Sequence, residues 1–182
     1  ELYRKQEKPF DSLAHTFFAV LYVAVPFAMM PFSAFLRTGL NSILPSKVQF
    51  SPGIIIGFFL LVWANDTGAY LTGVTLGRHK LMARISPGKT WEGFIGGMIL
   101  ASAAGWLFSG FLGVTGRVQW VIIAFIISVF GTYGDLAESM LKRSTGVKDS
   151  GSILPGHGGF LDRFDSTIFS FPLVYLFLTL FG

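Results

Sequence analysis

Cysteine is absent from this chain of 182 residues, and charge is scarce, since Asp, Glu, Lys and Arg make up only 13% of it. Without cysteine there is no disulfide, no thiolate metal site and no cysteine nucleophile, so any metal must be bound by oxygen or imidazole ligands. The charged share is about half of what soluble domains use to cover their surface. This share argues against a water-soluble globular domain.

Apolar residues are correspondingly abundant. The chain is 52% hydrophobic and 16% aromatic, and its mean hydropathy is +0.60. This composition predicts a membrane protein in contact with the lipid bilayer. The net charge of +4 is not a nucleic-acid signal here, because basic residues in membrane proteins mark cytoplasmic loops or phosphate-bearing ligands.

Five apolar runs are long enough to cross a membrane as helices. They predict an all-α polytopic membrane protein with spans near residues 13–36, 53–76, 93–114, 118–140 and 164–181. The third run has a stripe of small residues spaced four apart, which lets membrane helices pack closely. The stripe consists of Gly93, Gly97, Ala101 and Gly105.

The basic residues predict the orientation of these spans. Eleven of the fourteen Lys and Arg lie before the first span, between the second and third, and between the fourth and fifth, which places these segments in the cytoplasm. We expect a cytoplasmic N-terminal segment over residues 1–12 and a single transmembrane domain over 13–182. The chain begins without Met or a signal peptide, and we expect a fragment of a longer protein.

Asp66 lies well inside the second apolar run, where a charged side chain costs at least about 2.5 kcal/mol on insertion scales. Such a residue predicts a ligand or ion site, and the alternative is a structural hydrogen bond to a neighbouring helix. The adjacent Asn65, Thr67 and Gly68 suggest a locally opened helix that lines a polar cavity.

The connection that follows, "RHKLMARISPGKTWEG", ends in a stretch that resembles part of a phosphate-binding loop. Gly88 frees the backbone, and Lys89 and Thr90 can donate to oxyanions, with Ser86 at the start of the stretch. The GxxxxGK[ST] spacing is missing and we expect no strand before it, so a basic turn that only orients the protein is an equal alternative.

Acidic residues gather at the ends of the last two spans. Asp135, Glu138, Ser139 and Lys142 share one helical face, and Asp162 and Asp165 begin the fifth span. Two helix ends on the same side of the membrane thus offer paired carboxylates, the ligand type that suits Mg²⁺. The interleaved Lys and Arg are alternative partners for these acids.

Between these helix ends, "GSILPGHGGF" is glycine-rich, so backbone amides can approach a charged ligand. His157 can donate to a phosphate there, although a lone histidine is more often structural. Carboxylates for a cation beside basic residues and a glycine-rich loop are the parts needed for phosphoryl or nucleotidyl transfer.

The stretch "SMLKRSTGVKDSGSILPGHGGFLDRFD", Ser139 to Asp165, resembles the full signature of the phosphatidate cytidylyltransferases. "WANDTGAYLTG" and "SPGKTWEG" also resemble stretches of that family. The resemblance implies an inner-membrane enzyme, with its active site facing the cytoplasm, that joins CTP and phosphatidic acid into CDP-diacylglycerol and pyrophosphate with Mg²⁺. It also implies a homodimer.

The resemblance implies roles for residues of the domain at 13–182, which is then catalytic. As catalytic residues we expect Asp135, Asp162, Lys142, Arg143, Lys148, Asp149, His157 and Arg163. As substrate-binding residues we expect Asn65, Asp66, Ser86, Lys89, Thr90, Gly158 and Gly159. The first-rank metal ligands are Asp135 and Asp162, followed by Asp165. The alternatives are a CTP-dependent lipid kinase and, from another class, a cation transporter.

Overall fold

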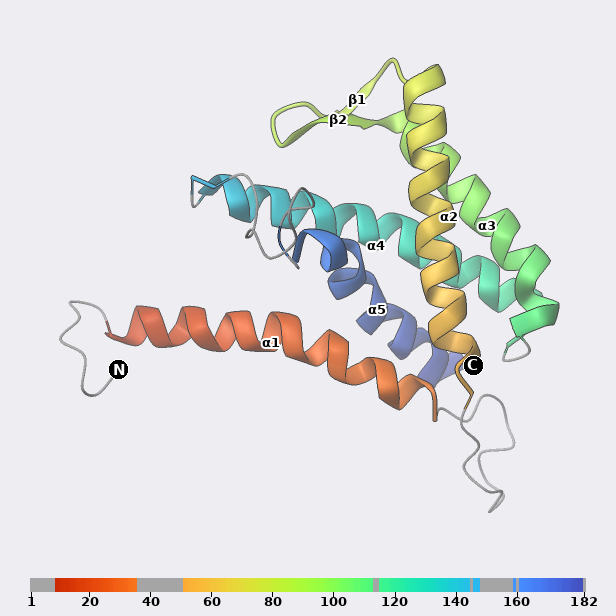
Figure 1. Cartoon of the computed structure of the whole chain (residues 1–182), viewed down its shortest axis with the longest axis horizontal. Coiled ribbons are helices and arrows are strands. Elements are labelled where there is room, and N and C mark those ends of the chain that lie inside the picture. Colours follow the sequence, from red (N-terminus) through yellow and green to blue (C-terminus); the bar gives the residue numbers. More distant parts are fainter. Residues whose placement is uncertain are drawn as a thin grey trace.

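Five long α-helices dominate the computed structural model, which describes residues 9–35, 51–112, 115–144, 146–147, 159 and 161–181 (Figure 1). Their bounds are α1 (Pro9–Ser33), α2 (Gly53–Leu76), α3 (Trp91–Leu112), α4 (Arg117–Ser144) and α5 (Leu161–Phe181). Each is long and apolar enough to cross a membrane. The chain is an all-α polytopic membrane protein, as predicted, with one short β-hairpin added.

The five predicted spans are confirmed, and their ends differ by a few residues. The second span coincides with α2, whereas α4 continues past residue 140 and α5 starts before residue 164. Helical hydrogen bonding continues where hydropathy falls, because Lys142 and Arg143 are favourable in the last turn of α4 and Asp162 in the first turn of α5. Hydropathy thus finds the spans but not their polar ends.

The small-residue stripe of α3 packs against its neighbours as predicted. α2 and α3 form the most extensive helix pair, and Gly93, Gly97, Ala101 and Gly105 are all buried. A Cβ atom on Gly97 would lie 2.7 Å from the carbonyl oxygen of Asn65. Glycine is therefore required at this crossing, because any side chain would push the two helices apart.

The prediction of a locally opened helix around Asp66 is wrong. α2 is a continuous α-helix from Gly53 to Leu76. Gly68 instead serves the packing, since a Cβ there would lie 2.9 Å from the Cβ of Leu100 on α3. The polar residues next to Asp66 indicated a cavity correctly, but an intact helix lines it.

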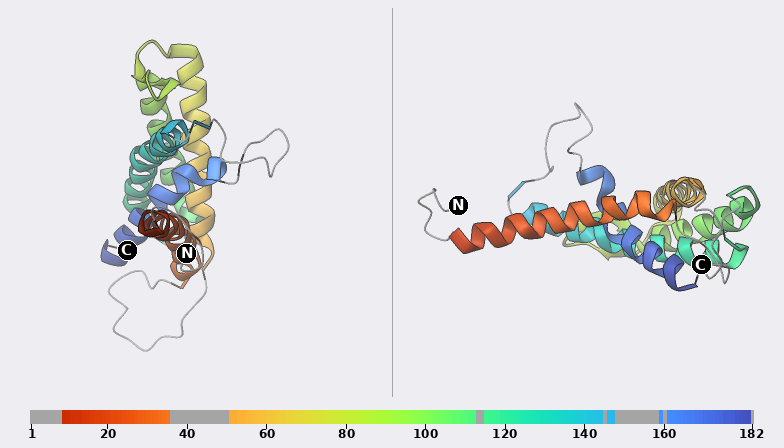
Figure 2. Two further views of the ribbon diagram at one scale, coloured as in Figure 1. Left: turned by 90° about the vertical axis from the view of Figure 1, so that its left-hand side faces the viewer. Right: turned by 90° about the horizontal axis from the view of Figure 1, so that it is seen from below.

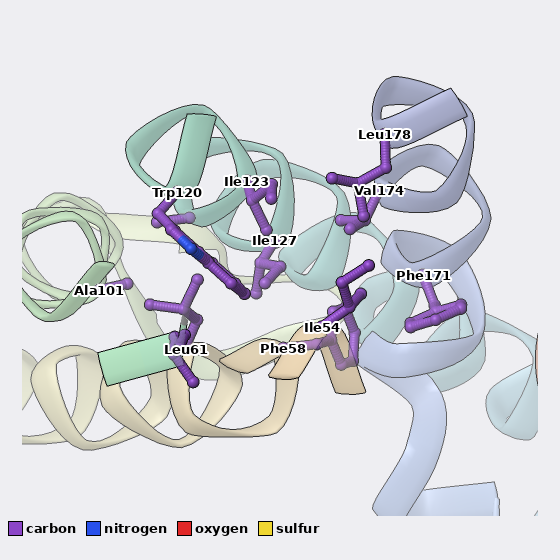
Figure 3. Close-up of a cluster of buried hydrophobic side chains, with 12 residues drawn as sticks. Ile54, Phe58, Leu61, Ala101, Trp120, Ile123, Ile127, Phe171, Val174 and Leu178 are labelled. Atoms are coloured by element: carbon purple, nitrogen blue, oxygen red, sulfur yellow. The ribbon is translucent and has the colours of Figure 1, made fainter. Parts of the chain in front are cut away.

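A cluster of buried apolar side chains holds α2, α3, α4 and α5 together (Figure 3). Phe58 on α2 meets Phe171 on α5 edge-on, with ring centroids 4.9 Å apart. Trp120 on α4 is 1% exposed and packs over Gly57, which has no side chain to obstruct the indole. This cluster fixes how α4 and α5 cross α2, and so it positions the polar helix ends beyond it.

A two-stranded antiparallel hairpin connects α2 to α3, with strands β1 (Lys80–Met82) and β2 (Ser86–Thr90). This corrects the expectation that no strand precedes the Ser86 to Thr90 stretch. Lys80 pairs with Thr90, and the backbone N–H of Trp91 donates to the carbonyl of His79 at 2.9 Å. The hairpin was not predicted, because a strand of three residues is too short to show the alternation of apolar and polar residues that identifies a strand.

α1 is the least covered helix. It packs mainly along α5 (Figure 2), and its phenylalanines Phe17 and Phe18 are each 62% exposed. In a membrane-spanning helix such side chains face lipid rather than water.

Candidate active site

A cavity of about 540 Å³ opens where the hairpin meets α2, α3, α4 and α5; we call it the polar cavity. Eight of the predicted site residues line it. From α2 and β2 these are Asn65, Asp66, Lys89 and Thr90, and from α4 and α5 they are Asp135, Asp162, Arg163 and Asp165. Segments far apart in the sequence are thus brought to one place.

Two glycines let α4 and α5 approach closely beside this cavity. A Cβ on Gly134 would lie 2.7 Å from the carbonyl oxygen of Asp165, and one on Gly131 would lie 3.3 Å from the Cβ of Ser166. Asp135 directly follows Gly134, so the absence of a side chain at residue 134 places Asp135 next to the start of α5. The predicted topology placed these two helix ends on the same side of the membrane, and in the structure they lie in contact.

Lys89 on β2 forms an ion pair with Oδ2 of Asp135 on α4. The other oxygen of Asp135 accepts a hydrogen bond from the hydroxyl of Ser139, at 3.3 Å. Both partners of the ion pair remain about one-third exposed, at 28% for Lys89 and 33% for Asp135. This contact puts the connection after α2 and the end of α4 on one side of the bundle, as the charge distribution predicted.

A second ion pair lies deeper, between Lys142 on α4 and Oδ1 of Asp162 on α5. Oδ2 of Asp162 accepts the backbone N–H of Gly159 at 2.8 Å, so both oxygens of this carboxylate are engaged. Glu138, one turn before Lys142, is 5% exposed and has its Oε1 atom 3.5 Å from the lysine Nζ. We call Glu138, Lys142 and Asp162 the Lys142 cluster.

Asp66 and Asp165 face the polar cavity without a cation of their own among the described residues. The amide of Asn65 lies 3.5 Å from Oδ1 of Asp66, and Asp165 accepts the N–H of Ser166. Lys89 and Asp135 are the charged neighbours of Asp66, and the same two groups are also charged neighbours of Asp165. Lys89 is thus near three carboxylates, and Arg163 is the other basic residue that lines the cavity in the described part of the chain.

Thr90, at the edge of the cavity, caps the start of α3. Its hydroxyl accepts the N–H of Gly93 at 3.1 Å, which caps the first turn of α3, and the residue is 6% exposed. Ser86, at the other end of β2, does not line the cavity. Of this stretch, Gly88, Lys89 and Thr90 line the cavity, and the Thr90 hydroxyl is already used to cap α3.

Arg143 is exposed and lies outside the cavity, one residue beyond Lys142. Four further predicted site residues, Lys148, Asp149, His157 and Gly158, lie outside the described residues. Gly159 is described, and its N–H orients Asp162.

Tyr70 and Ser166 line the cavity and were not predicted, and no role was predicted for Glu138, which lies outside it. Tyr70 stands one turn after Asp66, and Ser166 directly follows Asp165, so proximity to the acids was the available signal. Glu138 was placed on the acidic face of α4 but was given no role. The sequence could not show that it is buried against Lys142.

The carboxylates of the cavity fit a magnesium ion by their chemistry. Among the described residues that line the cavity, the side chains able to bind a metal offer oxygen atoms, and Mg²⁺ in proteins is held by one or two carboxylates together with water and phosphate oxygens. Within the described ranges, no group of three or more His, Asp or Glu side chains forms a ready-made metal cage. The donor set therefore suits an ion that arrives with a phosphate ligand rather than a closed structural site.

Comparison with known proteins extends this picture. The model of the cytidylyltransferase family matches residues 1–181. The chain is 43% identical over 176 residues to the phosphatidate cytidylyltransferase of Staphylococcus haemolyticus (strain JCSC1435), which covers 96% of this chain and 62% of that protein. It is 48% identical over 124 residues to the phosphatidate cytidylyltransferase of Bacillus subtilis (strain 168), covering 68% of this chain and 46% of that protein.

The chain spans about half to three-fifths of the length of these curated relatives, since it also covers 48% of the phosphatidate cytidylyltransferase of Staphylococcus aureus (strain COL), at 51% identity over 126 residues. The matched residues of the family model include α2, the hairpin, α4 and α5, the elements that carry the acids and the lysine of the polar cavity. With nearly its whole length matched by the family model, the chain belongs to the cytidylyltransferase family.

Proposed function

We propose that the protein transfers the cytidylyl group of CTP to phosphatidic acid, giving CDP-diacylglycerol and pyrophosphate. The observation that carries this proposal is the polar cavity itself, where Lys89 from the hairpin meets the acidic ends of α4 and α5 within a bundle of membrane-length helices. A lipid that ends in a phosphate reaches such a site from the bilayer, and a nucleotide reaches it from water. The relatives' name, phosphatidate cytidylyltransferase, supports the same substrates.

The reaction needs little from a general base. A phosphate oxygen of phosphatidic acid, already ionised, attacks the α-phosphorus of CTP and forms a new P–O–P bond. The bond between the α-phosphorus and its bridging oxygen to the β-phosphorus breaks, and its electron pair leaves with pyrophosphate. Positioning and charge neutralisation do most of the work in such transfers.

Basic residues at the cavity neutralise the phosphates in this proposal. Lys89 and Arg163 line the cavity, and Lys142 is held at its margin by Asp162. Arg143 and Lys148 stay predictions for the same task. Because the ion pair with Asp135 already orients the Lys89 side chain, this lysine is in position to bind a phosphate.

We propose Mg²⁺ as the cofactor, held by Asp135 together with the acids at the start of α5. When bound, the ion stabilises the negative charge that builds up on the triphosphate as pyrophosphate leaves. Asp162 stays a predicted ligand beside Asp165. Its two oxygens contact Lys142 and Gly159, as those of Asp135 contact Lys89 and Ser139, so an ion would replace an existing contact at either aspartate. In this proposal Asp162 orients the site until its lysine is displaced.

We further propose that the protein lies in the bacterial inner membrane as a homodimer, with the polar cavity facing the cytoplasm. The concentration of Lys and Arg in alternate connections supports this orientation. The homodimer rests on the family resemblance.

The direct test is to incubate the purified protein with phosphatidic acid, Mg²⁺ and CTP labelled at the α-phosphorus. A labelled lipid together with released pyrophosphate is the expected result. Release of CDP with an unlabelled phosphorylated lipid would instead indicate the CTP-dependent lipid kinase. Cation flux through proteoliposomes without CTP would instead indicate a transporter. The positive charges of Lys89 and Arg163 in the cavity argue against a cation pathway.

A further inference from the structure

Glu138 is a buried carboxylate on α4, one turn before Lys142. It is 5% exposed, and neither of its two carboxylate oxygens has a hydrogen-bond partner in the described part of the chain. Burying such a group without donors costs free energy, and native proteins seldom retain one without a reason. Glu138 does not line the polar cavity, so a direct contact with substrate does not supply that reason.

The cation nearest to Glu138 is engaged elsewhere. Nζ of Lys142 lies 3.5 Å from Oε1 of Glu138, too far for a normal charge-assisted hydrogen bond, because the same ammonium group contacts Oδ1 of Asp162. The Lys142 cluster thus contains two carboxylates and one ammonium group. In this structure the ammonium group lies with the carboxylate that faces the cavity.

The geometry allows the ammonium group to change partners. Glu138 and Lys142 are four residues apart on α4, the spacing at which an acid and a lysine meet on one helical face. The lysine has three donors on a flexible stem, and a shift of less than about 1 Å would bring it within hydrogen-bond distance of Glu138. Oδ1 of Asp162, which lines the cavity, would then no longer be paired with this ammonium group.

We propose that Glu138 is a positioning residue that receives the Lys142 ammonium group when Mg²⁺ or its phosphate ligand enters the polar cavity. The inference rests on the proposed function, because it needs a cation at Asp135 and the acids of α5. Without Glu138 the incoming ion must compete with Lys142 for Asp162. With Glu138 the lysine has a second, buried acceptor ready.

The test is Glu138→Gln, which keeps the size of the side chain and removes its charge. The first readout is binding without catalysis, measured as the rise in the thermal unfolding midpoint of the purified protein as MgCl₂ is added without nucleotide. We expect the half-saturating Mg²⁺ concentration to rise by about tenfold, the effect typical of losing a group outside the ligand shell. The same rise is expected in the Mg²⁺ dependence of cytidylyl transfer.

Two controls separate this role from a structural one. Glu92→Gln changes an acid that pairs with His79 outside the polar cavity, and it should leave the Mg²⁺ dependence unchanged. Glu138→Asp restores the charge and should recover part of the Mg²⁺ affinity. A purely structural Glu138 predicts the opposite pattern, a lower unfolding midpoint for Glu138→Gln with an unchanged Mg²⁺ dependence.

The outcomes also separate this inference from the proposed function. If Mg²⁺ stabilises the wild-type protein and Glu138→Gln equally, the role of Glu138 is overturned and the proposed function stands. If Mg²⁺ has no effect on the unfolding or the activity of the wild-type protein, both the cofactor and the role of Glu138 are overturned.

Discussion

Two lysine–aspartate pairs close the polar end of the bundle, and their surroundings differ. Lys89 and Asp135 join the hairpin to α4 in the wall of the polar cavity, with side chains 28% and 33% exposed. Lys142 and Asp162 join α4 to α5 with side chains 18% and 13% exposed, beside the buried Glu138. A solvated pair is worth at most about 1 kcal/mol, whereas breaking a buried one costs about 3 to 5 kcal/mol.

This difference in exposure indicates that the two ion pairs have different roles. The Lys89–Asp135 pair is open enough for a phosphate or a cation to replace either partner at little cost in stability. The Lys142 cluster holds the ends of α4 and α5 together, so a change in it affects folding as well as chemistry. Substitutions in the two pairs therefore separate the effect on activity from the effect on stability.

Asp162→Asn should have the largest effect, because it is expected to lower both the stability and the activity of the protein. It removes the carboxylate that joins α4 to α5 while Lys142 keeps Glu138 beside it, and we expect a loss of about 2 kcal/mol in the free energy of unfolding. Cytidylyl transfer should be abolished. Chemical denaturation and the labelled-CTP assay measure the two losses, and near-normal activity would contradict the assigned site.

Asp135→Asn should abolish activity without destabilising the protein. Loss of this charge removes several kcal/mol of transition-state stabilisation, a fall of about 10³-fold in kcat/KM. The free energy of unfolding should change by less than about 1 kcal/mol, because the pair with Lys89 is solvated. If Asp135→Asn destabilises the protein as much as Asp162→Asn does, the distinction between the two pairs is wrong.

Gly134→Ala tests the packing that places Asp135 beside α5. The added methyl group would lie 2.7 Å from the carbonyl oxygen of Asp165, and we expect a loss of about 1 to 3 kcal/mol in the free energy of unfolding. Gly110→Ala on α3 is the matched control, because nothing lies within 4 Å of its Cβ position. Equal unfolding midpoints for the two variants would show that α4 and α5 do not pack closely at Gly134.

Lys89→Gln should have the smallest effect. The variant loses one cation from the wall of the cavity, and we expect KM for CTP to rise by about tenfold, equivalent to 1.4 kcal/mol, with an unchanged unfolding midpoint. Lys80→Gln, on the exposed strand β1 of the same hairpin, should leave KM unchanged. An unchanged KM for Lys89→Gln would place the nucleotide elsewhere.

Local signals in the sequence were enough for the helices. Each span is an apolar run whose hydropathy is a sum over neighbours, and the small-residue stripe of α3 follows from a spacing of four. The acids on α4 and α5 were found in the same way, since helical periodicity put Asp135 and Lys142 on one face. Contacts between segments could not be predicted, because hydropathy and residue spacing each describe only one segment of the chain.

By itself, the sequence determined that the described part of this chain has five helices of membrane-spanning length, that most of its Lys and Arg fall in alternate connections, and that carboxylates and lysines occupy the ends of α4 and α5. Only the tertiary structure decided which lysine meets which acid. It paired Lys89 with Asp135 and Lys142 with Asp162, kept α2 intact beside Asp66, and used Thr90 to cap α3. The physical reason is that these contacts depend on how closely glycine-lined helices approach one another, which is a property of the packed bundle.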